Sequence, residues 1–202
     1  MTLHLPNSNN VTANILAGGR SSRMQGQDKG LIILGNQPMI THVIERLAPQ
    51  VDRISITANR NLDDYKQFGW PIISDTLADY PGPLAGFLSG LTNIKNEWIL
   101  NVPCDTPFLP GDLLQRFNAA IQNSNKNLVV ASTTDGLQPT FCLVHSSLKE
   151  DLQTYLEQGG RKTGQWILNN NPVIVEYADD TMGFANINTF DELEHAGQQF
   201  TK

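Results

Sequence analysis

The sequence predicts an α/β fold in which helices cover a mostly parallel central sheet. Strand-like and helix-like segments alternate through the first two thirds of the 202 residues, and this repetition is typical of a parallel sheet. Apolar residues make up 40% of the chain, which is enough to bury a full core. Because no linker, internal repeat or low-complexity run interrupts the pattern, we expect a single domain over residues 1–202.

The first predicted strand covers residues 11–17, where VTANILA reads as a buried segment. A helix over 38–48 follows, with a proline in its first turn and apolar residues on one face. That face is formed by Met39, Ile40, Val43, Ile44 and Leu47. The next strand is expected over 53–58, and a short helix over 62–68 leads to a strand over 70–74.

A helix over 83–94 and a strand over 97–102 complete the regular part of the chain. The apolar face of this helix consists of Leu84, Phe87, Leu88 and Leu91. In parallel sheets, ligands bind at the carboxyl ends of the strands, because loops and helix N-termini converge there. The stretches at such ends are residues 16–30, 75–82 and 103–108.

The last third is less regular, and we expect it to edge the sheet and close one side of a cleft. The predicted elements are strands over 128–133, 139–144 and 172–177, a helix over 146–160 and a segment of undecided structure over 161–168. Thr189 and Glu192 have the spacing of a capping box at the start of a final helix. NSNKN at 123–127 is typical of a surface turn.

Charge and composition exclude several classes of function. The net charge is −6 and the pI is about 5.1, without a run of lysines or arginines, so we expect no nucleic-acid partner. No apolar stretch is long enough to span a membrane, and the N-terminal residues lack the pattern of a signal peptide, so we expect a cytoplasmic protein. Cys104 and Cys142 form no CxxC motif and the histidines are scattered, which favours two buried thiols over a zinc site or a disulfide.

The segment at 16–30 has the composition of an anion-binding loop. It reads LAGGRSSRMQGQDKG and matches neither GxGxxG nor the Walker pattern. Its glycines nevertheless let backbone N–H groups approach an anion, and Arg20, Arg23 and Lys29 neutralise charge. A polyphosphate is therefore the expected ligand, and a solvated surface loop is the alternative.

Carboxylates follow two of the other predicted strands. Asp105 lies between prolines in NVPCDTPFLP, and a carboxylate held at a strand end opposite a phosphate loop suits Mg²⁺. Its alternative is a helix-capping or turn aspartate. Asp75 and Asp79 lie close to Gly82 and Gly86. Their carboxylates are suited to hold a ribose hydroxyl, a base edge or the metal. A solvated loop explains these two residues nearly as well.

The motifs that are missing also point to a reaction type. The chain contains no GxSxG, no HExxH and no cysteine beside a histidine partner, which disfavours side-chain nucleophiles. Phosphoryl or nucleotidyl transfer needs mainly cations and positioning, because charge repulsion is the chief barrier.

Four motifs together resemble the MobA-type molybdenum cofactor guanylyltransferase family: LAGGRSSRMQGQDKG, DTLADYPGPLAG, VPCDTPF and FANINTFDEL. The resemblance runs from about residue 12 to residue 195. It implies a Rossmann-like three-layer αβα nucleotidyltransferase fold with a mostly parallel central sheet. It further implies an enzyme that uses GTP and Mg²⁺ to attach GMP to the terminal phosphate of Mo-molybdopterin, releasing pyrophosphate.

The resemblance also assigns site residues. The GTP-binding part would lie at about 12–110, and its residues would be Leu16, Ala17, Gly18, Gly19, Lys29, Thr57, Asn59, Asp75, Gly82, Gly86 and Asp105. The acceptor part would lie at about 128–195, and the pterin side would be bound by Arg23, Arg161, Asn186 and Asn188. The catalytic residues would be Arg23, Lys29 and Asp105, with Asp105 as the Mg²⁺ ligand.

Two positions depart from the family pattern. Gln25 stands where a glycine is usual, which alters the loop without removing Lys29. Thr57 stands where the family often has asparagine, so its side-chain contact with GTP is in question, and Asn59 is a weaker candidate for that contact.

Other functions share parts of this pattern. Sugar-phosphate and polyol-phosphate nucleotidyltransferases have a similar loop and strand-end acid, molybdopterin cytidylyltransferases differ in the base they choose, and a non-catalytic nucleotide-binding regulator would bind GTP without releasing pyrophosphate. For the guanylyltransferase we expect a monomer with GTP and Mo-molybdopterin as substrates. Its further contacts would be transient, with other cofactor biosynthesis proteins and acceptor apo-enzymes.

Overall fold

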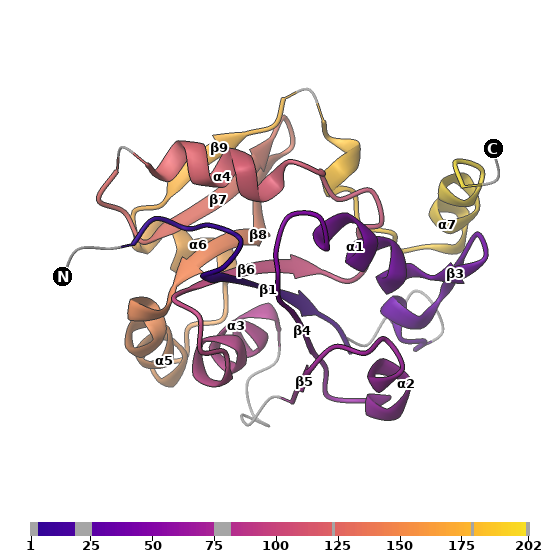
Figure 1. The fold of residues 1–202 in the computed structure, drawn as a ribbon, viewed down its shortest axis with the longest axis horizontal. Helices are drawn as coiled ribbons and strands as arrows, with labels where there is room; N and C mark the ends of the chain where they lie inside the picture. The colour runs from indigo at the N-terminus through magenta and orange to yellow at the C-terminus, as the bar shows by residue number, and fades with distance from the viewer. Residues whose placement is uncertain (1–3, 19–25, 75–81, 123, 179, 201–202) are drawn as a thin grey trace.

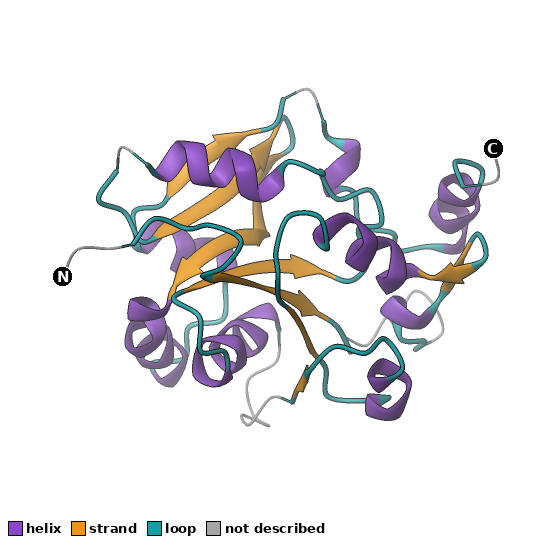
Figure 2. Cartoon of the chain, in the orientation of Figure 1, coloured by secondary structure: helices purple, strands orange, loops and turns teal. Residues whose placement is uncertain are grey.

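The computed structural model has a seven-stranded sheet between two layers of helices (Figure 1, Figure 2). It describes residues 4–18, 26–74, 82–122, 124–178 and 180–200. The strand order is β5-β4-β1-β6-β8-β7-β9. Every neighbouring pair of these strands is parallel except for the two pairs that β8 makes with β6 and β7. The predicted three-layer α/β fold with a mostly parallel sheet is confirmed.

The sheet is built mostly from short strands, and β1, β4, β6 and β7 are its most buried ones. The strands are β1 Val11–Leu16, β4 Ile54–Thr57, β5 Ile72–Ile73, β6 Trp98–Pro103, β7 Leu128–Thr133, β8 Gly136–His145 and β9 Val173–Glu176. A separate hairpin joins β2 Ile33–Leu34 to β3 Gln37–Pro38. β1 lies between β4 and β6, and helices cover both faces of the sheet, which explains its nearly continuous burial.

The helices connect the strands and cover the sheet. The α-helices are α1 Met39–Leu47, α2 Leu62–Lys66, α3 Pro83–Asn93, α4 Leu113–Ile121, α5 Lys149–Glu157, α6 Thr163–Asn169 and α7 Phe190–Gly197. Within the described ranges, the short 3₁₀ turns η2 Lys29–Leu31, η3 Ser146–Leu148 and η4 Met182–Phe184 lie in the connections. No helix of the described ranges is long and apolar enough to cross a membrane.

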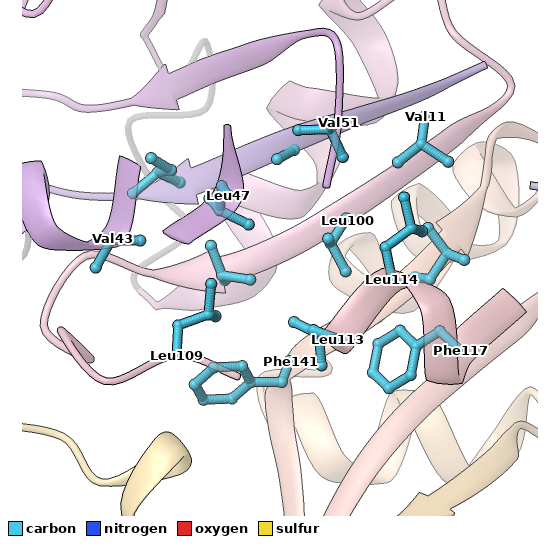
Figure 3. Packing of buried hydrophobic residues seen from close by; sticks show 14 of the residues in the cluster. Val11, Val43, Leu47, Val51, Leu100, Leu109, Leu113, Leu114, Phe117 and Phe141 are labelled. Carbon is cyan, nitrogen blue, oxygen red and sulfur yellow. The ribbon is translucent and has the colours of Figure 1, made fainter. Parts of the chain in front are cut away.

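Each face of the sheet has its own core. On one face, residues of α1 and α4 such as Val43, Leu47 and Phe117 pack against Val11 and Leu100 (Figure 3). The other face is covered by α3, α5 and α6, and its buried side chains include Phe87, Leu152 and Trp166. Alternate residues of each strand point to opposite faces, so the same strands supply both cores.

Most of the predicted helices and strands are present in the structure. The differences concern segments that were left undecided or were not predicted. The undecided segment 161–168 contains α6, because Trp166 and Ile167 pack into the second core and Trp166 Nε1 donates to Asp151 Oδ1 at 2.8 Å. Neither α4 nor the β2–β3 hairpin was among the predicted elements. The predicted helix 146–160 is η3 followed by α5.

Two smaller predictions are confirmed. The capping box at α7 is present, with the Thr189 hydroxyl accepting from the Glu192 backbone N–H and the Glu192 side chain accepting from the Thr189 backbone N–H. Cys104 and Cys142 are both buried free thiols. Residue 123 of the predicted turn lies outside the described residues.

Candidate active site

The carboxyl ends of β1, β4 and β6 lie side by side and carry the first group of predicted site residues. The Ala17 N–H donates to the Thr57 carbonyl at 2.8 Å, and the Cys104 N–H donates to the Leu16 carbonyl at 3.1 Å. These bonds keep the three chain segments together one residue beyond the strands. Gly18 has a φ of +74°, and a Cβ there would lie 3.0 Å from the Asn59 backbone nitrogen. Glycine is therefore required at position 18 by both conformation and space.

Lys29 and Asp105 meet at this edge of the sheet. The Lys29 Nζ lies 2.7 Å from Asp105 Oδ2, and the same ammonium donates to Asn188 Oδ1. The Asn186 amide donates to Asp105 Oδ1 at 2.7 Å. We call Lys29, Asp105, Asn186 and Asn188 the Lys29–Asp105 cluster. The structure thus brings together four of the predicted site residues, two from each expected half of the site.

The cluster is a polar site with little exposure to solvent. Asp105 is only 6% exposed, and both of its carboxylate oxygens accept hydrogen bonds from side chains. Its backbone carbonyl accepts from the Ile187 N–H at 2.9 Å, so the segment around Asn186 is fixed to Asp105 through main chain and side chain. Charges in such a position interact more strongly than they would in water. The ammonium of Lys29 and the carboxylate of Asp105 therefore lie at the edge of the sheet where the glycine-rich segment leaves β1.

Hydrophobic contacts hold the segment that carries Asn186 and Asn188. Phe184 of η4 packs edge-on against Phe141 and Tyr177, with ring centroids 4.7 Å apart in each case. After Asn188 the chain enters α7, and the Asn188 backbone N–H donates to the Glu192 carboxylate at 2.6 Å. The two amides therefore lie between a buried aromatic anchor and a capped helix.

The neighbouring thiol is not a candidate nucleophile. Burial raises the pKa of the Cys104 thiol well above its usual range, and the charges of Asp105 and Asp28 act in the same direction, while Lys29 opposes them. Cys104 therefore stays protonated at neutral pH. This agrees with a reaction that uses cations and positioning rather than a side-chain nucleophile.

Two residues assigned to GTP binding have structural contacts inside the protein. The Thr57 hydroxyl is buried and donates to Asn14 Oδ1 at 2.7 Å. A Cβ at Gly86 would lie 2.7 Å from Leu16 Cδ2, so this glycine allows α3 to pack closely on β1. Gly82 precedes α3 with a φ of +108° and open space around it, so its backbone conformation favours glycine.

Arg161 lies in the connection between α5 and α6. Its guanidinium donates to the carbonyls of Leu156 and Gly160 at 2.8 and 2.7 Å. Gly164, in the first turn of α6, lies near Pro139, close to the start of β8. Because β8 runs antiparallel to β6, its start lies at the edge of the sheet where β6 ends. The predicted site residues Gly19, Arg23 and Asp75 lie outside the described residues, as do Arg20, Gln25 and Asp79.

The structure adds a group of residues that the sequence did not suggest. Asp28 is buried beside Lys29, and its carboxylate accepts hydrogen bonds from Tyr65 at 2.6 Å and from Asn61 at 3.1 Å. The guanidinium of Arg60 lies 3.5 Å from the same carboxylate. The one sequence signal was the position of Asp28 next to the lysine of the glycine-rich segment.

Comparisons with known proteins show the family to which this chain is related. The family described as "MobA-like NTP transferase domain" matches residues 13–171, which is more than half of the chain. The chain belongs to this family. Among its curated MobA-like relatives, proteins named molybdenum cofactor guanylyltransferase are 45% identical in Haemophilus influenzae and 47% identical in Cupriavidus pinatubonensis. Each alignment covers 91% of this chain, and 96% and 94% of the relatives respectively.

Solved structures show that the MobA-like fold extends over almost the whole chain. Molybdopterin-guanine dinucleotide biosynthesis protein A from Archaeoglobus fulgidus superposes with a TM-score of 0.75 at 20% identity, covering 94% of this chain and 98% of that one. A CMP:2-keto-3-deoxy-manno-octonic acid synthetase complexed with CTP also gives 0.75, at 14% identity and with 95% and 98% coverage. At these identities the likeness establishes the fold alone.

Proposed function

We infer that this chain is a molybdenum cofactor guanylyltransferase, which transfers GMP from GTP to the terminal phosphate of Mo-molybdopterin. The observation that carries this conclusion is the identity of 45–47% over 91% of the chain to curated relatives of that name. In the reaction, an oxygen of the acceptor phosphate attacks the α-phosphorus of GTP. The bond from that phosphorus to the oxygen bridging to the β-phosphate breaks, and pyrophosphate leaves.

The described residues suit the electrostatic needs of this reaction. Lys29 is the cation that would neutralise charge on the triphosphate. Its ammonium donates to Asp105, which follows the end of β6. Leu16, Ala17 and Gly18 lie at the carboxyl end of β1, at the same edge of the sheet. Their backbone is the proposed contact for the nucleotide. Because the reaction brings two anionic phosphates together, fixed positive groups lower its barrier more than a general base would.

The cluster fits a magnesium ion in its donor chemistry. Asp105 already holds a cation, since the ammonium of Lys29 lies 2.7 Å from its carboxylate. Among the described residues there is no group of three or more His, Cys, Asp or Glu side chains that would form a closed metal site. Mg²⁺ is commonly held by one or two carboxylates together with substrate phosphates, so Asp105 is the proposed ligand. When bound, the ion would neutralise charge on the triphosphate.

The acceptor is proposed to lie on the side of Asn186 and Asn188. Their contacts with Asp105 and Lys29 support a meeting of acceptor and nucleotide at the cluster. Amide groups suit the donors and acceptors of a pterin ring, and Arg161 and Arg23 are the proposed partners of acceptor phosphate. We place the reaction in the cytoplasm, where GTP is available, and propose that the enzyme acts as a monomer.

The decisive experiment is incubation of the protein with molybdopterin loaded with molybdenum, Mg²⁺ and each labelled nucleoside triphosphate in turn. We expect one labelled product, formed from GTP, and an equal amount of pyrophosphate. A product from CTP would identify a cytidylyltransferase, and a product only with sugar or polyol phosphates would identify that class. Binding of GTP without pyrophosphate release would indicate a regulator.

The substitution Asp105→Asn tests the proposed metal ligand. We expect turnover to fall about a hundredfold or more, since losing a charge that acts in the transition state costs about 3 kcal/mol. Turnover is measured as pyrophosphate release over a magnesium titration. Asp64→Asn, at an exposed carboxylate of α2, is the control and should behave as wild type. Wild-type turnover of Asp105→Asn at saturating magnesium would remove Asp105 from the reaction.

A further inference from the structure

The carboxylate of Asp28 is buried beneath the backbone that carries Lys29. Asp28 stands at the N-terminus of η2, but its side chain makes no capping bond there and turns inward. Its Oδ1 accepts from the Tyr65 hydroxyl at 2.6 Å, and its Oδ2 accepts from the Asn61 amide at 3.1 Å. A buried carboxylate without partners would be strongly destabilising, so these donors determine where Asp28 can lie.

Arg60 extends the same contact along the main chain. Its Nε lies 3.5 Å from Asp28 Oδ2, and its two terminal nitrogens donate to the carbonyls of Gly26 and Gln27, each at 3.1 Å. One side chain from the connection after β4 therefore holds three consecutive residues that lead into Lys29. A planar guanidinium presents its donors in a fixed fork, which suits this arrangement better than a lysine would.

The Tyr65 hydroxyl lies against the end of the glycine-rich segment. It donates to Asp28 Oδ1 at 2.6 Å. Burial raises the pKa of Tyr65 well above its usual range, so the hydroxyl remains a donor. A Cβ at Gly30 would lie only 2.6 Å from this hydroxyl, so the chain after Lys29 passes directly against Tyr65.

We propose that Asp28, held by Tyr65 and Arg60, is a positioning residue that fixes Lys29 for the nucleotide. Lysine has a long and flexible side chain, so its Nζ is placed reproducibly only when its backbone is fixed. The anchored residues 26–28 lead directly into Lys29, and the Lys29 Nζ is found 2.7 Å from Asp105. This inference rests on the proposed function, in which Lys29 neutralises the triphosphate of GTP.

A double-mutant cycle on GTP affinity tests whether Asp28 acts through Lys29. Calorimetry with GTP and Mg²⁺ would compare wild type, Asp28→Asn, Lys29→Ala and the double variant. We expect Asp28→Asn to weaken GTP binding about tenfold in the wild-type background and by less than about twofold in the Lys29→Ala background. Equal losses in the two backgrounds would overturn the proposal, because Asp28 would then act independently of Lys29.

A second variant keeps the test decisive if Asp28→Asn fails to fold. Tyr65→Phe removes only the hydroxyl and should give the same non-additive pattern. The matched control is Tyr155→Phe. The Tyr155 hydroxyl donates to the Lys162 carbonyl, far in sequence from Lys29, so its removal should leave GTP affinity unchanged. An additive loss in Tyr65→Phe, or an equal loss in Tyr155→Phe, would contradict the proposal.

Hydrogen exchange separates the proposal from the function on which it rests. The amides of Leu31 and Ile32, which donate to the carbonyls of Asp28 and Lys29, should exchange faster in Tyr65→Phe than in wild type without any ligand. Unchanged exchange would overturn the anchoring itself. Faster exchange in a protein that binds no GTP would instead overturn the proposed function and leave the anchoring intact.

Discussion

At the level of single residues, the carboxylate of Asp105 joins parts of the chain that the sequence suggested would act separately. The resemblance assigned Asp105 to the GTP part and Asn186 to the acceptor part. In the structure these two side chains share a hydrogen bond of 2.7 Å, although they are 81 positions apart. Lys29 contacts Asn188 across an even longer separation. A substitution on the acceptor side should therefore also change how Asp105 and Lys29, the residues proposed to bind Mg²⁺ and GTP, are held.

The substitution Asn186→Ala tests this coupling. Asp105 would lose the donor on Oδ1 and keep only Lys29, so its carboxylate would be less well oriented. We expect the dissociation constant of GTP, measured by calorimetry in magnesium, to rise about threefold to tenfold, which corresponds to the usual worth of about 1 kcal/mol for a hydrogen bond. Asn127→Ala, which removes an exposed amide bonded to Ser147, is the control. Unchanged GTP affinity in Asn186→Ala would restore the separation of the two halves.

The residues of the site differ in how far the sequence could predict them. Lys29 and Asp105 were found because a glycine-rich segment and a strand-end carboxylate have a recognisable chemistry. The placement of the Thr57 hydroxyl against Asn14 depends on a contact between two strands, which no local pattern encodes. Asp28 was missed for the same reason, since its partners come from α2 and the preceding connection.

At the level of elements, two glycines of α3, Gly86 and Gly90, let this helix pack closely on the sheet. Beneath it, Asn14 and Asn101 are fully buried, and the Asn14 amide donates to Asn101 Oδ1 at 3.0 Å and to the Gly86 carbonyl at 3.3 Å. A Cβ at Gly90 would lie 2.8 Å from the Asn14 amide nitrogen. Glycine in the middle of a helix normally lowers stability, so here close packing explains its presence.

The substitution Gly90→Ala should destabilise the protein by about 1–2 kcal/mol, measured by urea unfolding. Overpacking a core typically costs about 1–3 kcal/mol, while alanine regains up to about 1 kcal/mol of helix propensity. Gly164→Ala in α6 is the matched control, because its Cβ would meet Pro139 at an ordinary 3.7 Å. We expect this control to be neutral or slightly stabilising. Equal effects of the two substitutions would contradict the packing explanation.

The two elements that were not predicted, α4 and the β2–β3 hairpin, differ in how clearly the sequence marks them. The buried residues of α4 are Leu113, Leu114, Phe117 and Ile121, which have the spacing of one helical face. That helix was therefore present in the sequence pattern. The β2–β3 hairpin has two residues in each strand, which is too short for alternation to be seen.

At the level of the whole molecule, the alternation of strands and helices predicts the layers but not the order of the strands. Successive βα units make β1, β4, β5 and β6 parallel to one another, as expected. The position and direction of β8, between β6 and β7, do not follow from any local pattern. They depend on the match of buried residues such as Cys142 and Leu143 with both neighbouring strands.

The stability of the folded chain should depend on pH through His145. Burial lowers the pKa of His145 and the charge of Glu97 opposes this effect, while the His145 Nδ1 accepts from the Ser147 backbone N–H at 3.2 Å. The unfolded chain therefore takes up a proton at a higher pH, near the ordinary value of about 6.5. Stability should be full above that pH and fall as the pH drops toward the lower folded value.

The test is the thermal midpoint of wild type and His145→Asn between about pH 8 and pH 5. Asparagine keeps an acceptor near the Ser147 N–H but does not titrate in this range. We expect the thermal midpoint of the wild type to fall by more degrees than that of the variant as the pH drops through about 6.5. Parallel curves for the two proteins would exclude His145 as a source of the pH dependence.

The insertion of β8 between β6 and β7 has a consequence for biosynthesis. As the chain leaves the ribosome, β1, β4, β5 and β6 emerge before any residue of β8, so the first half-sheet has no partner along one side of β6. An unpaired, apolar strand edge is a site at which nascent chains associate with one another. The interval between synthesis of Pro103 and of His145 is thus the period in which this edge of β6 is open to association with another nascent chain.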